Sequence, residues 1–210
     1  MTGSSLLPLR IVAVAVGLAL TLGACQKAVA PVTSEDMSMG PANAKVTVIE
    51  YASVACPVCA QFNNEVFPAF KKKYIDTGRV HYVSREALTH DPALAAAGFV
   101  TARCAGKDKY FQVVDDIYHA QEEIETGGQP ETVLARIAAK AGVPKERFEV
   151  CIRDPKALNA VNARWERYVN DDKITGTPTF VINGKTYDSG DMTLAQLDAA
   201  IAEAEAKGKS

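Results

Sequence analysis

Two cysteines three positions apart, in the segment Cys56-Pro57-Val58-Cys59, have the spacing of a dithiol that can close into a small disulfide ring. The segment lies where a strand-like stretch passes into a helix-like one. At a helix start the first backbone N–H groups have no intrahelical partner and the helix dipole is positive, so an anion is favoured there. We therefore expect the pKa of Cys56 to lie below the ordinary thiol value of about 8.5.

The other three residues of this segment have complementary roles. Pro57 suits the first helical turn, where its missing N–H costs nothing and its fixed φ is already helical. Cys59 lies one turn further along the same helix face and is expected to be less exposed than Cys56. Cys56 is therefore the predicted attacking thiol and Cys59 the resolving thiol, with Val58 between Pro57 and Cys59. This chemistry needs no cofactor beyond the Cys56–Cys59 disulfide itself.

A strand, a helix and a second strand must position the dithiol. Residues 44–51 alternate and are rich in β-branched side chains, which predicts a buried strand. The helix that starts at Cys56 or Pro57 is expected to reach about Tyr74, with a kink at Pro68 unless the helix restarts there. Residues 79–83 form the second predicted strand. Such a unit predicts two parallel strands with a right-handed crossover.

The rest of the chain divides into a helical block and a return to the sheet. Every periodic segment in residues 91–172 is helical, beginning where Asp91 caps and Pro92 opens a helix. After it we expect a hairpin of strands 179–182 and 185–187, then a final helix with a capping box at Thr193. The predicted organisation is one α/β domain, residues 44–90 and 173–210, that contains a helical insertion, residues 91–172.

The N-terminus has the pattern of an export signal. Arg10 precedes an apolar run from Ile11 to Leu22, which is the length of a signal-peptide core and too short for an ordinary transmembrane helix. The run ends in Leu22-Gly23-Ala24-Cys25, which resembles the lipobox of bacterial lipoproteins; a plain secretory signal is the alternative. We expect residues 1–24 to be removed, Cys25 to be lipidated, and residues 25–43 to form a flexible tether on the periplasmic side of an inner or outer bacterial membrane.

Charge and histidine spacing argue against two other functions. The 23 Lys and Arg residues against 25 Asp and Glu give a net charge of −2, and no segment is strongly basic, so nucleic-acid binding is excluded as a function class. His81, His90 and His119 share no ligand spacing and are read as ordinary polar residues, so no metal site is predicted. Among them, His90 precedes the helical block and is the one that could line the active-site rim.

Three motifs in register resemble the DsbA-like branch of the thioredoxin superfamily over about residues 41–206. They are the redox motif Cys56-Pro57-Val58-Cys59, the acid Glu50 six residues before the first cysteine, and the segment Gly176-Thr177-Pro178-Thr179. The resemblance implies an α/β thioredoxin fold with an all-helical insertion between the βαβ unit and the C-terminal ββα unit. It also implies a cis Thr177-Pro178 bond, with Thr177 and Pro178 in the substrate-binding loop.

The resemblance gives Glu50 and the remaining cysteines specific roles. From sequence alone Glu50 is either a partly exposed strand residue or a buried carboxylate with a raised pKa; in the latter case it exchanges a proton with Cys59 through water. Cys104 and Cys151 are either free core thiols or, in an exported protein, a structural disulfide. Some DsbA-like proteins have such a second bridge, and closing this loop would stabilise the domain by about 4 kcal/mol.

The implied activity is that of an exported protein disulfide oxidoreductase, acting as a monomer. It would introduce disulfides into reduced or misoxidised exported client proteins and be reoxidised by a DsbB-like, quinone-linked membrane partner. Val58 departs from the histidine that strong oxidants of the family have there, and Thr177 also occurs in reductive relatives. A disulfide reductase or isomerase is therefore the alternative. A copper-binding or metal-delivery protein is a third reading, since two thiolates can hold Cu(I).

Overall fold

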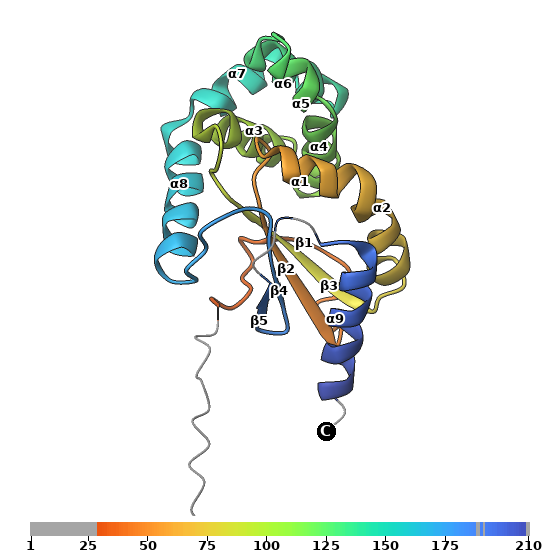
Figure 1. Ribbon diagram of the computed structural model, residues 1–210. Helices are drawn as coiled ribbons and strands as arrows, with labels where there is room; N and C mark the ends of the chain where they lie inside the picture. The colour runs from red at the N-terminus through yellow and green to blue at the C-terminus, as the bar shows by residue number, and fades with distance from the viewer. Residues whose placement is uncertain (1–28, 188–189, 191, 209–210) are drawn as a thin grey trace, which may run out of the picture.

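The computed structural model describes residues 29–187, 190 and 192–208, and its centre is a five-stranded sheet. The strand order is β1-β3-β2-β4-β5 (Figure 1). The strands are β1 (Met37–Met39), β2 (Val46–Ala52), β3 (Val80–Glu86), β4 (Thr179–Ile182) and β5 (Lys185–Tyr187). β2 and β3 are parallel, as predicted, whereas β1, β4 and β5 pair antiparallel with their neighbours.

One nearly continuous helical stretch connects β2 to β3. It consists of α1 (Pro57–Gln61), η1 (Phe62–Val66), α2 (Phe67–Phe70) and η2 (Lys71–Ile75), where the η segments are π turns. The expected irregularity at Pro68 appears as the wide turn η1 directly before α2, so that Pro68 lies in the first turn of a new α segment. Because the first N–H groups of a helix need no intrahelical acceptor, the missing N–H of proline is tolerated there.

Six helices form the block between β3 and β4, and Figure 1 shows α3 to α7 gathered at one end of the sheet. Asp91 caps α3 by accepting hydrogen bonds from the N–H groups of Ala93 and Leu94. The helical stretch from Lys107 to Glu125 is divided at Ala120 into two helices. The helices are α3 (Pro92–Cys104), α4 (Lys107–His119), α5 (Gln121–Glu125), α6 (Pro130–Lys140), α7 (Lys145–Arg153) and α8 (Pro155–Asn170), and α9 (Leu194–Lys207) follows the hairpin.

Helices cover both faces of the sheet, which explains why β2 is buried along nearly its whole length. On one face Val48 and Tyr82 pack in a core with residues of α2 and α9. On the other face Ile49 and Tyr51 pack against Tyr168 of α8. The core of the helical block is separate, and both Cys56 and Cys59 belong to it. The dithiol therefore lies where the block meets the sheet.

The tether expected over residues 25–43 is shorter than predicted. Met37–Met39 is strand β1, which pairs antiparallel with β3. The fully buried Arg85 holds the preceding segment, since its guanidinium lies 3.3 Å from Asp36 and donates to the Ala30 carbonyl at 2.7 Å. Long-range ion pairs and backbone hydrogen bonds hold this segment in place. Its sequence therefore shows little hydrophobic periodicity. Cys25 and residues 1–24 lie outside the described part of the chain.

Buried ion pairs also fix the helical block to the sheet. Glu86, at the end of β3, is 1% exposed and accepts hydrogen bonds from Arg103 of α3 at 2.6 Å and from Arg164 of α8. These two ion pairs offset the cost of removing the Glu86 carboxylate from water. The strand order of the sheet and the helical block between β3 and β4 confirm the α/β thioredoxin fold with an all-helical insertion. In the described part of the chain, no helix combines the length and apolarity needed to cross a membrane.

Candidate active site

Cys56 is the N-cap of α1, directly before Pro57. Its Sγ accepts a hydrogen bond from the Cys59 backbone N–H at 3.4 Å, and both cysteines are free thiols in this structure. Both residues are 0% exposed, so Cys56 is less accessible than expected from sequence. The reason is that the motif packs against the helical block. Most of that block is distant in sequence, so periodicity near the motif does not predict this contact.

The segment before β4 lies against Cys56. The Thr177–Pro178 peptide bond is cis, and the Thr177 carbonyl oxygen lies 3.5 Å from Cys56 Sγ. Pro178 is buried, whereas Thr177 is partly exposed. The structure thus brings Thr177 and Pro178 beside Cys56, which lies more than a hundred positions earlier in the chain.

The two thiols of the motif have opposite pKa shifts. Hydrogen bonds from Cys59 lower the pKa of Cys56 to about 5, against the opposing effect of desolvation. Burial, together with the neighbouring Cys56, raises the pKa of Cys59 well above its ordinary value. At neutral pH the reduced site therefore holds one thiolate, Cys56, and one protonated thiol, Cys59.

Glu50 is the buried acid of the site. It lies in β2 between β3 and β4, is 4% exposed, and accepts a hydrogen bond from the Tyr82 hydroxyl at 2.6 Å. Desolvation raises its pKa to about 7, although the Tyr82 hydrogen bond opposes the shift. A cavity of about 310 Å³ borders Glu50 and extends to Asn63, Asp115 and Lys71 near the surface. Polar groups and a volume of this size suit bound water.

Several residues that support the site were not singled out from the sequence. The Gln121 amide, at the start of α5, donates to the carbonyls of Val54 and Cys56 at 2.7 and 3.2 Å and so fixes the backbone before α1. Tyr82 holds Glu50, as described above. No local motif marks either side chain, since each acts on a residue at least 32 positions away.

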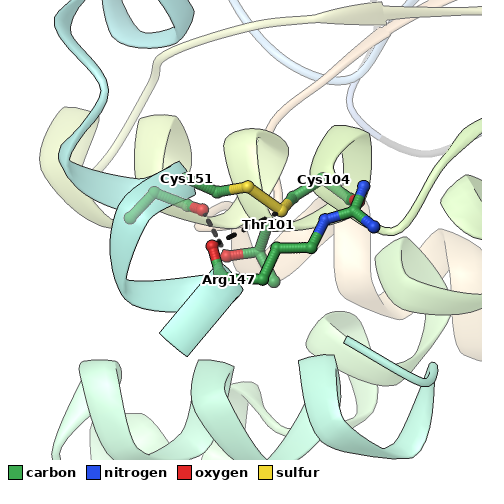
Figure 2. The surroundings of a disulfide bond; sticks show 5 residues. Thr101, Cys104, Arg147 and Cys151 are labelled. Carbon is green, nitrogen blue, oxygen red and sulfur yellow. Dashed lines mark hydrogen bonds between the residues drawn. A yellow bond between two sulfur atoms is a disulfide. The ribbon is translucent and has the colours of Figure 1, made fainter. Parts of the chain in front are cut away.

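The remaining two cysteines of the described chain form a disulfide. Cys104 of α3 and Cys151 of α7 are joined, with their Cα atoms 6.1 Å apart. Figure 2 shows the bond between these helices with Arg147 alongside, and the Arg147 guanidinium donates to the Cys104 carbonyl at 3.0 Å. The bond closes a loop with a sequence separation of 47 and lies within the helical block.

The fold and the site define a thioredoxin-fold protein with one reactive dithiol. The dithiol combines a low-pKa Cys56 with a buried Cys59, next to a cis-proline segment and a buried acid. Among the described residues no cluster of three or more His, Cys, Asp or Glu side chains is arranged to hold a metal ion.

Comparison with known proteins gives the family. The thioredoxin family model matches residues 32–203. Two Rickettsia proteins named for protein-disulfide oxidoreductase activity are similar. The R. bellii protein is 32% identical over 84% of this chain and 68% of its own length, and the R. felis protein 33% over 85% and 65%. The crystal structure of Wolbachia pipientis α-DsbA1 aligns with a TM-score of 0.74 and 26% identity, covering 85% of this chain and 94% of that one.

The chain therefore belongs to the thioredoxin family, and it is a thiol–disulfide oxidoreductase of the DsbA type. The family resemblance found in the sequence is confirmed. The matched Rickettsia proteins are longer, since this chain spans about two thirds of their length.

The low pKa of Cys56 predicts a pH-dependent stability difference between the reduced and oxidised forms. The folded-state value of about 5 lies below the ordinary 9.0, so the thiolate contribution is complete above pH 9 and is lost as the pH falls through 5. Only the reduced form has this thiolate, while Glu50 is present in both forms. The reduced-minus-oxidised free energy of unfolding should increase by about 2 kcal/mol from pH 5 to pH 7.

Urea unfolding with and without reductant measures this difference. A Cys104→Ala/Cys151→Ala background ensures that only the Cys56–Cys59 pair changes state, and Cys56→Ala in the same background should remove the pH dependence. A difference that stays constant between pH 5 and pH 7 would contradict the thiolate assignment.

Proposed function

We propose that this protein is an exported thiol–disulfide oxidase that donates the Cys56–Cys59 disulfide to reduced client proteins. The observation that carries the proposal is the environment of Cys56, whose thiolate is stabilised by Cys59 at the start of α1. A thiolate stabilised in the reduced form makes the reduced enzyme the favoured state, and its disulfide is then oxidising.

The proposed reaction has two exchange steps. A client thiolate attacks Cys56 Sγ, the Cys56–Cys59 bond breaks, and Cys59 leaves and takes up a proton. The client's second thiolate then attacks the client sulfur of the mixed disulfide, which forms the client's disulfide and releases the Cys56 thiolate. Thr177 and Pro178, beside Cys56, would bind the client chain through backbone groups.

Glu50 is the proposed proton carrier for Cys59. Because the pKa of Cys59 is strongly raised, its thiolate needs a proton donor as it leaves and a base when it attacks during reoxidation. Glu50, with a pKa of about 7, can act in both directions, and water in the adjacent cavity would connect it to solvent.

Replacing Glu50 should slow the attack of Cys59 on a mixed disulfide at Cys56. For Glu50→Gln we expect a loss of about 100-fold at pH 7, because general-base assistance is removed. The wild-type rate should rise with pH through about 7, and the variant should lose this dependence. Rapid-quench measurement of release of a small thiol bound to Cys56 gives the rate.

Tyr82→Phe is the matched variant for this experiment. It keeps the Glu50 carboxyl but removes the hydrogen bond that holds its pKa down, so the midpoint of the pH profile should move upward. A Glu50→Gln enzyme that releases the thiol at the wild-type rate from pH 5.5 to pH 9 would rule out the proton-carrier role.

Two assays on the same preparation test the direction of exchange. The oxidised protein should accelerate oxidative refolding of a reduced protein with several disulfides, and it should be a poor catalyst of insulin reduction. Efficient insulin reduction with little oxidative refolding would favour the reductase or isomerase alternative.

The location and partners are part of the same proposal. Lipid attachment at Cys25 and cleavage after residue 24 would hold the domain at the periplasmic side of a bacterial membrane, where a DsbB-like, quinone-linked oxidase would restore the disulfide. The sequence pattern Leu22-Gly23-Ala24-Cys25 supports this anchor. Mass spectrometry of the mature N-terminus, with Cys25→Ser as the unmodified control, tests it; an unlipidated mature chain would remove the anchor.

A further inference from the structure

The loop between β3 and α3 reaches the segment of Thr177 and Pro178 through a pair of hydroxyl groups. Thr89 Oγ1 lies 2.6 Å from Thr177 Oγ1, and either hydroxyl can be the donor. Among the described residues the other polar contact of the Thr89 hydroxyl is longer, 3.5 Å to Nδ1 of the exposed His90. The Thr89 side chain is therefore bound mainly to Thr177, which lies 88 positions further along the chain.

Ser53 connects Thr89 to the start of the redox motif. Ser53 lies directly after β2 and is 0% exposed. Its hydroxyl donates to the Thr89 carbonyl at 3.1 Å and accepts from the Ala55 N–H at 3.2 Å. Its carbonyl accepts from the Cys56 N–H at 3.0 Å. Thr89 is therefore fixed relative to the backbone that carries Cys56.

The hydroxyl pair is the hydrogen bond that holds Thr177 in both working states of the enzyme. The other polar contact of Thr177 in the described part of the chain is its carbonyl, 3.5 Å from Cys56 Sγ, and only a protonated thiol can donate there. Neither the Cys56 thiolate nor the Cys56–Cys59 disulfide has a proton on this sulfur. The contact between Thr89 and Thr177 does not depend on the redox state and so remains.

The backbone of Thr177 is available to a bound chain. Within the described residues its N–H has no hydrogen-bond acceptor, and its carbonyl has no donor once Cys56 is a thiolate or a disulfide. A client strand that pairs with these two groups places its own sulfur according to the direction in which they point. Small errors in such placement cost a large part of the rate of a reaction between bound groups. The hold on the Thr177 side chain therefore matters for clients.

We propose that Thr89 is a positioning residue for client binding, whose hydroxyl holds the Thr177 side chain so that the Thr177 backbone pairs with an extended client chain beside Cys56 Sγ. This inference rests on the proposed function and deepens it. Thr89 takes no part in the exchange between thiol and disulfide, because its hydroxyl contacts Thr177 and His90 and no sulfur among the described residues. Its loss should therefore weaken the reaction with peptides and leave the reaction with small thiols unchanged.

The test compares two reductants of the oxidised protein. One is an unstructured peptide with two cysteines, and the other is β-mercaptoethanol, which has no peptide backbone. The peptide passes two electrons to the Cys56–Cys59 pair and forms its own disulfide; one of its two protons ends on Cys59 and the other goes to solvent, since Cys56 stays a thiolate. Two β-mercaptoethanol molecules do the same and form one disulfide. Glutathione disulfide in the assay reoxidises the enzyme for repeated turnover.

Thr89→Val removes the hydroxyl and keeps the β-branched shape of the side chain. We expect it to raise the KM for the peptide about fivefold, the effect of losing one neutral hydrogen bond. The kcat for the peptide and the rate with β-mercaptoethanol should stay at the wild-type values. Thr89→Ser keeps the hydroxyl and should retain the wild-type KM.

Two further variants separate this role from a general structural one. Thr177→Val removes the other hydroxyl of the pair and should raise the KM by the same factor. Thr89→Val/Thr177→Val should raise it no further, because both changes break one contact. Thr77→Val is the matched control, since its exposed hydroxyl bonds the Lys73 carbonyl just before it in the chain, and it should leave the KM unchanged.

The outcomes are distinguishable. An unchanged peptide KM for Thr89→Val, an equal loss with peptide and β-mercaptoethanol, or fully additive effects of the two valine changes would overturn the role of Thr89 while leaving the proposed function intact. A wild-type oxidised protein that does not oxidise the peptide would instead remove the proposed function itself.

Discussion

Cys56→Ser should abolish thiol–disulfide exchange, and Cys59→Ser should trap it halfway. Without Cys56 the remaining thiol, Cys59, is fully buried and stays protonated because burial raises its pKa, so no competent nucleophile or electrophile is left. Without Cys59, a mixed disulfide between Cys56 and a client with a single cysteine has no second thiol, in the enzyme or in the client, to resolve it. When Cys56 of the Cys59→Ser protein is first converted to a mixed disulfide with a small aromatic thiol, the thiolate of a single-cysteine client displaces that thiol. We expect close to one client molecule bound per protein, measured by non-reducing electrophoresis and mass spectrometry.

The matched controls are the same substitutions at the other two cysteines of the described chain. Cys104→Ser/Cys151→Ser should retain exchange activity, because that pair joins α3 to α7 within the helical block and Cys56 and Cys59 remain free to form their own disulfide. Retained exchange in Cys56→Ser, or failure of Cys59→Ser to accumulate mixed disulfide, would contradict the assignment of the two thiols.

Loss of the Cys104–Cys151 disulfide should have the largest effect on stability. The bond closes a loop with a sequence separation of 47, and the chain-entropy model gives about 4 kcal/mol for a loop of that length. For a chain of this size such a loss lowers the melting temperature by about 10 °C. Urea unfolding with and without reductant, in a Cys56→Ser/Cys59→Ser background, isolates this bond because no other disulfide of the described chain can form.

Two results decide this second prediction. A decrease of about 4 kcal/mol in the free energy of unfolding on reduction, absent in a protein that also has Cys104→Ala and Cys151→Ala, supports a structural bond. A decrease below about 1 kcal/mol would mean that the helical block is held by its apolar core and by the Glu86 ion pairs alone.

Local chemistry explains what the sequence predicted well. The caps at Asp91 and Thr193 depend only on neighbouring residues, and both are found with the expected side-chain hydrogen bonds. The βαβ unit and the hairpin follow from short-range periodicity and from Asn183-Gly184 at the turn. The family resemblance depends on three motifs, and the fold that it implied is the fold observed.

Long-range contacts explain what the sequence did not predict. The burial of Cys56, the support from Gln121 and the contact of Thr89 with Thr177 all depend on how distant parts of the chain pack around the motif. Strand β1 is held by its pairing with β3, and the segment before it by Arg85, which no local pattern connects to Asp36. Residues distant in sequence determine these features, so periodicity within one segment carries no information on them.

The central claim is that the Cys56–Cys59 disulfide is oxidising, and its redox potential against glutathione at pH 7 is the most direct test. Stabilisation of the Cys56 thiolate predicts a potential clearly less negative than about −230 mV, the lower end of the glutaredoxin range. A value near about −270 mV, as for thioredoxin, would contradict the claim and make the protein a reductant.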